Sequence, residues 1–297
     1  MNRSISGVKT WTIVSAIFGI IVSLIGMGEA LYYYKKLNLD PQIELIIVTL
    51  IVFACALSVS FSSYIVYFAM TSDEDTFSNN RYILMLFSLS VGGLITPYLL
   101  MKLPNTNVQT TITPRVSISR GYGYSFLATG LVTLLTFIGL YAKNSGISSI
   151  MDGDFKTYNI LIVAISGAMI FWGLLNVATF SAKSTEGTFE KKGAAYTWMM
   201  ILSTINLIIG TISLIWVIIA SVLNIISLIS DIFNRRDGLL AIFTIPLILL
   251  RIAMQFFVIY TAANCMKSIW APKGYTYGQY QKLASREEDY LSSRKKG

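Results

Sequence analysis

The sequence YTWMMILSTINLIIGTISLIWVIIASVLNIISLIS, residues 196–230, runs for 35 residues without a charged side chain. A transmembrane helix needs about 20 predominantly apolar residues to cross the hydrocarbon core of a bilayer. A soluble domain of this size has no interior long enough to bury such a helix. The stretch therefore predicts an integral membrane protein.

The composition of the whole chain agrees with this prediction. Of the 297 residues, 54% are hydrophobic and 13% are charged, whereas about a quarter of the residues in a globular protein are charged. We therefore expect an all-α, polytopic bundle of membrane-spanning helices. The net charge of +8 indicates basic loops beside anionic lipid rather than nucleic-acid binding.

Several kinds of chemistry are poorly represented among the side chains. The chain has no histidine, which is the commonest general base and metal ligand. Its two cysteines, Cys55 and Cys265, lie in apolar runs and are typical of packing residues rather than of a disulfide or metal site. The sequence predicts no cofactor, no metal site and no catalytic residue. An intramembrane enzyme built from Asp, Ser or Lys stays an alternative.

Apolar runs predict seven spans. The first follows Arg3 and Lys9, as in a signal peptide, but no small-x-small cleavage site follows it. The tyrosines and lysines of residues 32–36 are typical of an interfacial belt, so this run is a retained span. Gly92 and Pro97 predict a kink in the third span. The spans lie at about residues 11–30, 43–70, 82–103, 122–142, 160–182, 196–230 and 239–263.

Two polar segments indicate an internal duplication. The first and fourth spans align at an offset of 113 residues, and the pattern S-x-E-x-T-F occurs at residues 72–77 and 184–189, an offset of 112. Apolar matches between spans arise easily, but a shared polar pattern at nearly the same offset does not. We therefore expect a duplicated three-span unit. Both polar segments are also typical of helix N-caps.

The expected domains follow this duplication. Trp216 and the residues after it match the first span after one gap, which indicates a partial third copy. The predicted parts are the first three-span repeat (1–103), a polar linker (104–120), the second three-span repeat (121–215), the partial third repeat (216–268) and a polar basic tail (269–297).

The long apolar stretch forms either one helix or a hairpin that turns near Gly210. One helix of 35 residues would be about 52 Å long, so it would have to tilt, kink or project from the bilayer. Small and polar residues recur in it near a 3.5-residue period, which favours one helix that packs through this stripe. The stripe includes Ser203, Asn206, Gly210, Ser213 and Asn224. We therefore expect seven spans, with eight as the alternative.

The lysine and arginine residues orient the chain. With seven spans, the side that includes the tail carries 15 of them and the other side carries 7. The positive-inside rule then places the tail in the cytoplasm and the N-terminus outside the cell membrane. Tandem three-span units lie in opposite orientations, which is the geometry of inverted-repeat transporters.

Arg251 is the most unusual residue of the predicted spans, because it lies midway through the last one. A charged side chain at this depth costs at least about 2.5–3.5 kcal/mol. Pro246, five residues earlier, removes a backbone donor and frees the carbonyl of Ile242, and Gln255 follows Arg251 one turn later. With Glu29, at the end of the first span, they form a candidate intramembrane polar site. The alternatives are a structural arginine that pairs with a carboxylate or lipid phosphate, and an interfacial glutamate.

These features favour a small transporter, permease subunit or channel with an inverted-repeat bundle. The alternative is a non-catalytic membrane scaffold, assembly factor or accessory subunit of a larger envelope complex, because the spans are poor in the acidic and histidine sites that coupled transport uses. The expected partners are the lipid bilayer, including anionic lipid, and other membrane subunits or a second copy of the chain. Asn176, Asn206 and Asn224 are interpreted as hydrogen-bonding residues between helices rather than as ligands.

Overall fold

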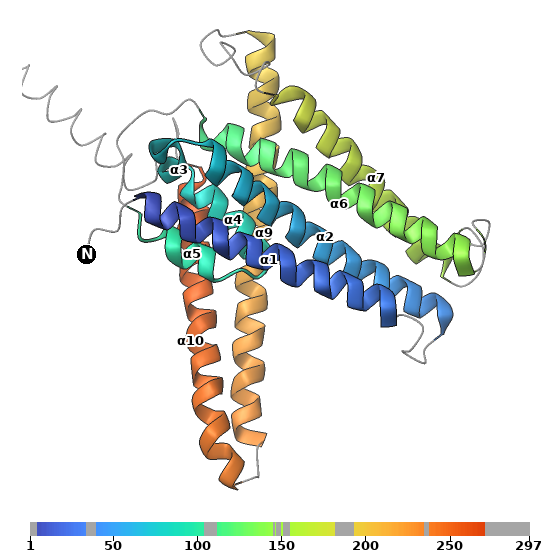
Figure 1. Cartoon of the computed structure of the whole chain (residues 1–297), viewed down its shortest axis with the longest axis vertical. Coiled ribbons are helices and arrows are strands. Elements are labelled where there is room, and N and C mark those ends of the chain that lie inside the picture. The colour runs from blue at the N-terminus through green and yellow to red at the C-terminus, as the bar shows by residue number, and fades with distance from the viewer. Residues whose placement is uncertain are drawn as a thin grey trace, which may run out of the picture. The chain divides into compact units, whose positions relative to one another are not determined.

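The computed structural model describes residues 5–33, 40–103, 112–144, 146, 150, 155–181, 193–234 and 238–270 (Figure 1). Of these residues 91% are in α-helices, and none of them lies in a strand. The all-α class predicted from the composition is confirmed.

Six helices of the described chain are long and apolar enough to cross a membrane. The shortest has 24 residues, or about 36 Å, against a hydrocarbon core of about 30 Å. The protein is therefore a multi-pass membrane protein, with six such helices where the sequence predicts seven spans. The six are α1 (Ile5–Tyr33), α2 (Pro41–Thr71), α6 (Pro114–Asn144), α7 (Lys156–Thr179), α9 (Ala194–Asn234) and α10 (Gly238–Ser268).

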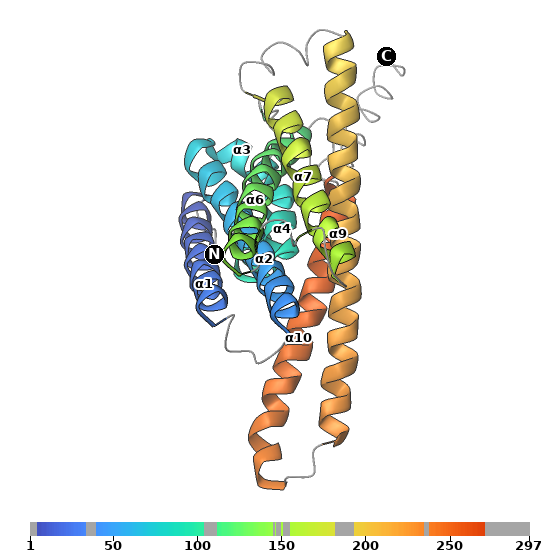
Figure 2. The same ribbon diagram turned by 90° about the vertical axis from the view of Figure 1, so that its right-hand side faces the viewer.

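The long apolar stretch lies within a single helix. α9 continues without a break through Gly210 for 41 residues, about 62 Å, as Figure 1 and Figure 2 show. The prediction of one helix is confirmed, and the alternative turn near Gly210 does not form. Because α9 is about twice as long as the hydrocarbon core is thick, it must tilt strongly or extend beyond the bilayer.

The predicted third span is a helical hairpin instead. Residues 82–103 form two short helices that contact each other, α4 (Arg81–Ser90) and α5 (Ile95–Leu100). Between them Gly92 has a φ of 78°, which residues other than glycine rarely adopt. The guanidinium of Arg81 donates to the carbonyl oxygen of Leu103 at 2.6 Å. The two ends of the hairpin therefore lie together, and the chain returns to the side from which it came.

The turn of this hairpin satisfies its own backbone donors. The N–H groups of Val91 and Gly93 donate to the carbonyl oxygen of Ser88, and that of Gly92 donates to Leu89. Inside a membrane this is required, because hydrocarbon offers no water to an exposed N–H group. Nearly all side chains of α4 are buried, and α4 contacts α10 as well as α5. The kink predicted for this segment is therefore a complete reversal of the chain.

Two compact units make up the chain, and each is described by itself. The four-helix unit, Ser6–Asp73 and Arg115–Asn206, contains α1, α2, α6, α7 and the first part of α9. The re-entrant unit, Met1–Ile5, Glu74–Pro114 and Leu207–Gly297, contains α4, α5, the rest of α9, α10 and the short helix α3 (Glu74–Asn79). The duplication and its boundaries stay predictions.

The first S-x-E-x-T-F segment ends one helix and begins another. The hydroxyl and the N–H group of Ser72 both donate to the carbonyl oxygen of Phe68, in the last turn of α2. Helix α3 then begins at Glu74 with two carboxylates in its first turn. Negative charges at this end interact favourably with the helix dipole. Ser72 thus closes α2 and is not the predicted N-cap of a following span. The second copy, residues 184–189, lies outside the described residues.

Small residues bring the helices of the four-helix unit close together. The hydroxyl of Ser23 on α1 donates to that of Ser58 on α2 at 2.8 Å. Gly19 on α1 faces Ser62 on α2, and about two turns later Gly26 faces Cys55 on the same helix. Such contacts are typical of membrane helices, because small side chains let two backbones approach.

Helices α6 and α7 approach even more closely at Gly173, which generates a prediction. A Cβ atom at Gly173 would lie 2.5 Å from the backbone nitrogen of Leu127, whereas a Cβ at Gly167 on the same helix has open space. We expect Gly173→Ala to lower the free energy of unfolding by about 1–3 kcal/mol, as overpacking does. Gly167→Ala, the matched control, should leave it unchanged or raise it by up to about 1 kcal/mol. Thermal unfolding in detergent measures both, and equal shifts would contradict the close approach.

The hairpin formed by α4 and α5 predicts that positions before and after it face the same aqueous compartment. Single cysteines at Glu74 and Lys102, in a chain carrying Cys55→Ser and Cys265→Ala, are expected to react with a membrane-impermeant maleimide from the same side of sealed vesicles. A membrane span over residues 82–103 predicts labelling from opposite sides instead, so the two arrangements give different outcomes.

Candidate functional site

The predicted intramembrane polar site is divided between the two units. Arg251 and Pro246 are exposed on α10, and Gln255 is half-buried one turn after Arg251. The helix continues through Pro246. Glu29 is exposed near the end of α1, which belongs to the four-helix unit. A functional role for these four residues stays a prediction.

The predicted packing stripe on α9 differs along its length. Ser203, Asn206 and Gly210 are buried, and Ser213 is half-buried with its hydroxyl 2.8 Å from that of Ser90 on α4. Asn224, farther along the same helix, is exposed. After Gly210, the buried residues described on α9 are Leu214, Ser221 and Ile225, and Asn224 is not among them.

Asn206 is the centre of a buried hydrogen-bond network in the four-helix unit. Its amide donates to Asn176 Oδ1 on α7 at 2.6 Å and to Ser119 Oγ on α6 at 3.0 Å. Its Oδ1 accepts from Trp172 Nε1 at 2.9 Å. Asn176 in turn donates to the carbonyl oxygen of Trp172. The network joins α6, α7 and α9 and uses both amide hydrogens of Asn206, so it leaves no donor of this residue for a ligand.

Basic side chains gather where α1 and α6 begin and where α2 and α7 end. Lys9 on α1 donates to the carbonyl oxygen of Ser72, just after α2. Arg120 on α6 donates to the carbonyl oxygen of Phe180, just after α7, at 2.8 Å. Arg115 donates to the hydroxyls of Ser203 and Thr204 on α9. We call this the basic end of the four-helix unit. Two of its cations, Lys9 and Arg120, satisfy carbonyl groups that helix ends leave without intrahelical partners.

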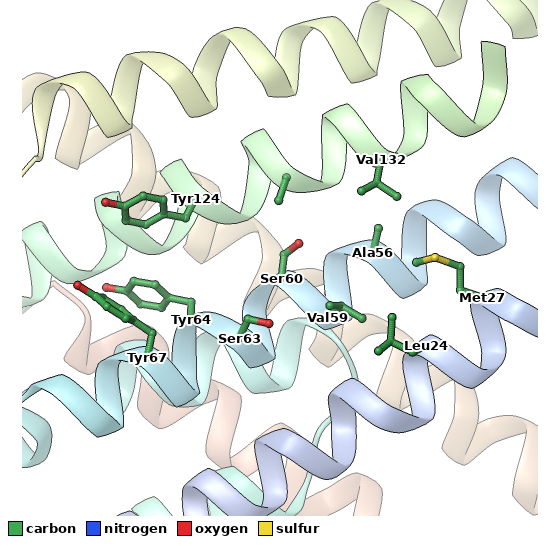
Figure 3. A pocket seen from close by; sticks show the side chains of 11 residues that line it. Leu24, Met27, Ala56, Val59, Ser60, Ser63, Tyr64, Tyr67, Tyr124 and Val132 are labelled. Atoms are coloured by element: carbon green, nitrogen blue, oxygen red, sulfur yellow. The ribbon is translucent and has the colours of Figure 1, made fainter. Parts of the chain in front are cut away.

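A pocket of about 610 Å³ lies between α1, α2 and α6, within the four-helix unit (Figure 3). This volume is within the range of about 300–1,000 Å³ that small-molecule sites occupy. Figure 3 shows three tyrosines gathered at one end, and larger apolar side chains at the other. The lining residues are Leu24, Met27, Ala56, Val59, Ser60, Ser63, Tyr64, Tyr67, Tyr124, Ala128 and Val132.

The tyrosine end of the pocket lies toward the basic end of the unit. Tyr67 is one turn before the end of α2, and the hydroxyl of Tyr64 donates to the carbonyl oxygen of Ser117, in the first turn of α6, at 2.8 Å. This bond fixes the ring of Tyr64 and joins α2 to α6. Tyr67 and Tyr124 are exposed, with 57% and 47% of their surface accessible, so their hydroxyls can meet a ligand.

Two serines of α2 add polar groups along the pocket. Ser60 Oγ accepts a hydrogen bond of 3.3 Å from Thr129 on α6, and Ser63 is exposed. All the polar groups of the lining are hydroxyls, which carry no charge at neutral pH. The arrangement suits recognition of an uncharged ligand by shape and hydrogen bonding.

Helix α1 forms the least buried wall of the pocket. Its buried residues are Val8, Thr12 and Ala16, all in its first half. Its second half, which includes the lining residues Leu24 and Met27, contacts α2 through the small side chains described above. A helix held by few buried contacts is easier to displace than one packed on all sides.

The pocket was not among the sites that the sequence predicts. One signal for it exists: Ser60, Ser63, Tyr64 and Tyr67 recur at helical spacing on one face of an otherwise apolar span. The residues from α1 and α6 carry no such signal, because which helices lie beside α2 cannot be read from a single sequence.

Metal sites and relatives give no further indication of function. The described residues contain no group of three or more His, Cys, Asp or Glu side chains that could hold a metal ion. No protein-family model matches the chain, and comparison with curated proteins and with solved structures gives no match.

The network around Asn206 predicts a difference between two asparagines of α9. Asn206→Leu removes three interhelical hydrogen bonds and is expected to lower the free energy of unfolding by about 2 kcal/mol. Asn224→Leu, on the exposed part of the same helix, should change it by less than about 0.5 kcal/mol. Unfolding in bicelles measures both. If the two variants lose the same stability, the network does not hold α6, α7 and α9 together.

Proposed function

We propose that this protein is a small membrane transporter whose substrate site is the pocket between α1, α2 and α6. The observation that carries the proposal is the pocket itself, which is built from three membrane-spanning helices and contains both hydroxyl and apolar groups. Its volume lies within the range of small-molecule sites, and pockets between the helices of a bundle are a common place for such sites. The function of Arg251 and its neighbours stays open as a second site on α10.

Helix α1 is the element of the pocket that moves in this proposal. Gly19, Ser23 and Gly26 give it a smooth contact with α2, and small residues let helices shift without unpacking large side chains. Displacement of the second half of α1 opens the pocket between α1 and α6. The network of Asn206 holds α6, α7 and α9 as the part that stays fixed.

Six spans also change the proposed topology. With the re-entrant hairpin counted as a loop, one side of the membrane carries 16 lysine and arginine residues and the other carries 6, and Arg251 lies within a span. The larger group is in residues 1–10, 72–120, 180–193 and 264–297. The positive-inside rule then places both ends of the chain in the cytoplasm, in contrast to the N-terminus outside that seven spans imply. A cysteine at Ser181 is expected to react from the same side as one at Lys102.

This topology gives the two proposed copies the same orientation, so they are parallel repeats and not inverted ones. Each copy contributes a helix pair, α1 with α2 and α6 with α7. One contact recurs in both pairs: a basic residue near the start of the first helix donates to the carbonyl that ends the second, Lys9 to Ser72 and Arg120 to Phe180. This correspondence supports a duplication of the helix pair.

A membrane scaffold or accessory subunit is the second candidate function. The observation that favours it is the length of α9, because a helix of 41 residues has about 30 Å more than a bilayer core requires. Native mass spectrometry of protein extracted gently from its membrane distinguishes the two. Other subunits at fixed stoichiometry support the scaffold, and a lone chain or small homo-oligomer supports the transporter.

The transport proposal predicts that filling the pocket stops flux. Ala128→Trp and Ser63→Trp each place an indole in the pocket, while Leu135→Trp, the control, places one on an exposed position of α6. In proteoliposomes tested with a panel of radiolabelled uncharged solutes that carry hydroxyl or carbonyl groups, both pocket variants should lose at least about 90% of the flux of the solute that wild type carries, because the ligand volume is occupied. The control should retain it. Equal flux in Ala128→Trp and wild type, or no flux of any solute in wild type, contradicts the proposal.

A further inference from the structure

We infer that the pocket takes an uncharged amphiphile about as long as one leaflet is deep, with a hydroxyl or carbonyl head at the tyrosine end and an apolar tail toward the middle of the membrane. The inference rests on the proposed function, because it names the substrate class of the same site. It follows from the length, polarity and charge of the pocket, which are taken in turn.

The length of the pocket matches half of a bilayer. Along α2 its lining runs from Ala56 to Tyr67, which is about 16 Å at 1.5 Å per residue. The hydrocarbon core is about 30 Å thick, so one leaflet contributes about 15 Å. Ala56 lies at the middle of α2, and Tyr67 lies one turn from its end. The pocket therefore extends from one membrane interface to the midplane, and a solute small enough to sit anywhere within it would leave much of it empty.

Polarity changes along this length in the same sense as in a lipid leaflet. The hydroxyls of Tyr67 and Tyr124 lie at the end near the interface, and Ser60 and Ser63 lie between the tyrosines and the apolar end in Figure 3. Tyrosines at this depth have an apolar ring and a polar tip, and the tip hydrogen-bonds a partner of either donor or acceptor type. Tyr64 contributes its ring, because its hydroxyl already donates to Ser117.

The apolar end accepts a hydrocarbon tail. Leu24, Met27 and Val132 line it, and no hydroxyl group lies among these three residues. Met27 has a flexible thioether chain that adapts to irregular or variable shapes. The surroundings of this end are lipid, so binding of a tail there buries no apolar surface that was in contact with water. The affinity must therefore come from packing and from the head group.

The charge of the surroundings favours a neutral head over an anionic one. A carboxylate or phosphate head would need a cation, and arginine is the usual partner of both. The cations nearest in the fold serve other groups: Lys9 donates to Ser72, Arg120 to Phe180 and Arg115 to hydroxyls on α9. None of the lining residues carries a charge, so burial of an ion in the pocket would be unfavourable.

Photolabelling with matched probes tests this substrate class. The full-length protein in nanodiscs is exposed to dodecanol that carries a diazirine in its tail, and in parallel to the corresponding dodecanoate and to the corresponding dodecane. We expect dodecanol to label the peptide around Ala56 and Val59 several-fold more than the peptide around Leu135, and unlabelled dodecanol to compete. Dodecanoate and dodecane should label both peptides at the level of bulk lipid.

Substitution of the tyrosines tests the head-group contact. Tyr67→Phe and Tyr124→Phe each remove one hydroxyl and are expected to weaken dodecanol binding by about 2- to 10-fold, the effect of a single hydrogen bond. Tyr260→Phe, on an exposed position of α10, is the matched control and should bind as wild type does. Unchanged binding in both pocket variants overturns the assigned orientation of the head.

The outcomes separate the substrate class from the transport proposal. If dodecanoate or dodecane labels the pocket as well as dodecanol does, the substrate class is wrong while the site stands. If dodecanol labels the pocket but no proteoliposome flux responds to Ala128→Trp, the class stands and transport is overturned. If no probe labels the pocket peptide above the Leu135 peptide, both proposals fall.

Discussion

Every backbone N–H and C=O group inside a hydrocarbon layer must find its partner within the protein, and this constraint explains the main departures of the fold from a simple bundle. The helices meet it internally except at their ends. At those ends the chain supplies side chains from neighbouring helices, as Lys9 does for Ser72 and Arg120 for Phe180. Arg81 serves the same purpose for Leu103, so three basic residues of the chain donate to the protein's own carbonyl groups.

The same constraint shapes the pocket. Helices α2 and α6 are joined at its tyrosine end by the bond from Tyr64 to Ser117, and α6, α7 and α9 are joined by the asparagine network. Polar contacts thus join α2, α6, α7 and α9. Helix α1 is held to α2 by Lys9, by the hydrogen bond from Ser23 to Ser58 and by small residues, and its buried residues all lie in its first half. A rigid framework with one lightly held wall is an arrangement in which a ligand can change the position of a single helix without disturbing the rest.

Much of the fold can be predicted from the sequence. The parts that cannot be predicted all have the same cause. Hydropathy predicts the six long helices, because it depends on local composition. The continuity of α9 is predicted by the periodic spacing of its small and polar residues, which is also a local signal. Residues 82–103 have the same local composition as a span, yet they reverse direction at Gly92 because α10 and α5 are there to cover α4. The exposure of Asn224 and the grouping of Tyr64, Tyr67 and Tyr124 likewise depend on which helices are neighbours. A single sequence shows which segments form helices, but it does not show which helices pack against each other.

The contact between α4 and α10 has a consequence for how the protein is made. Cys265 on α10 lies against Met85 on α4, 180 residues earlier in the chain. Membrane helices insert as they are synthesised, so α4 emerges long before α10, the helix that covers it. The apolar surface of α4 therefore stays uncovered until translation is nearly complete. Contacts of such large sequence separation form late and slowly. During this interval the nascent protein exposes a short helix that is too short to span the membrane by itself, which makes the re-entrant unit the part of the chain that most needs protection by chaperones or insertases.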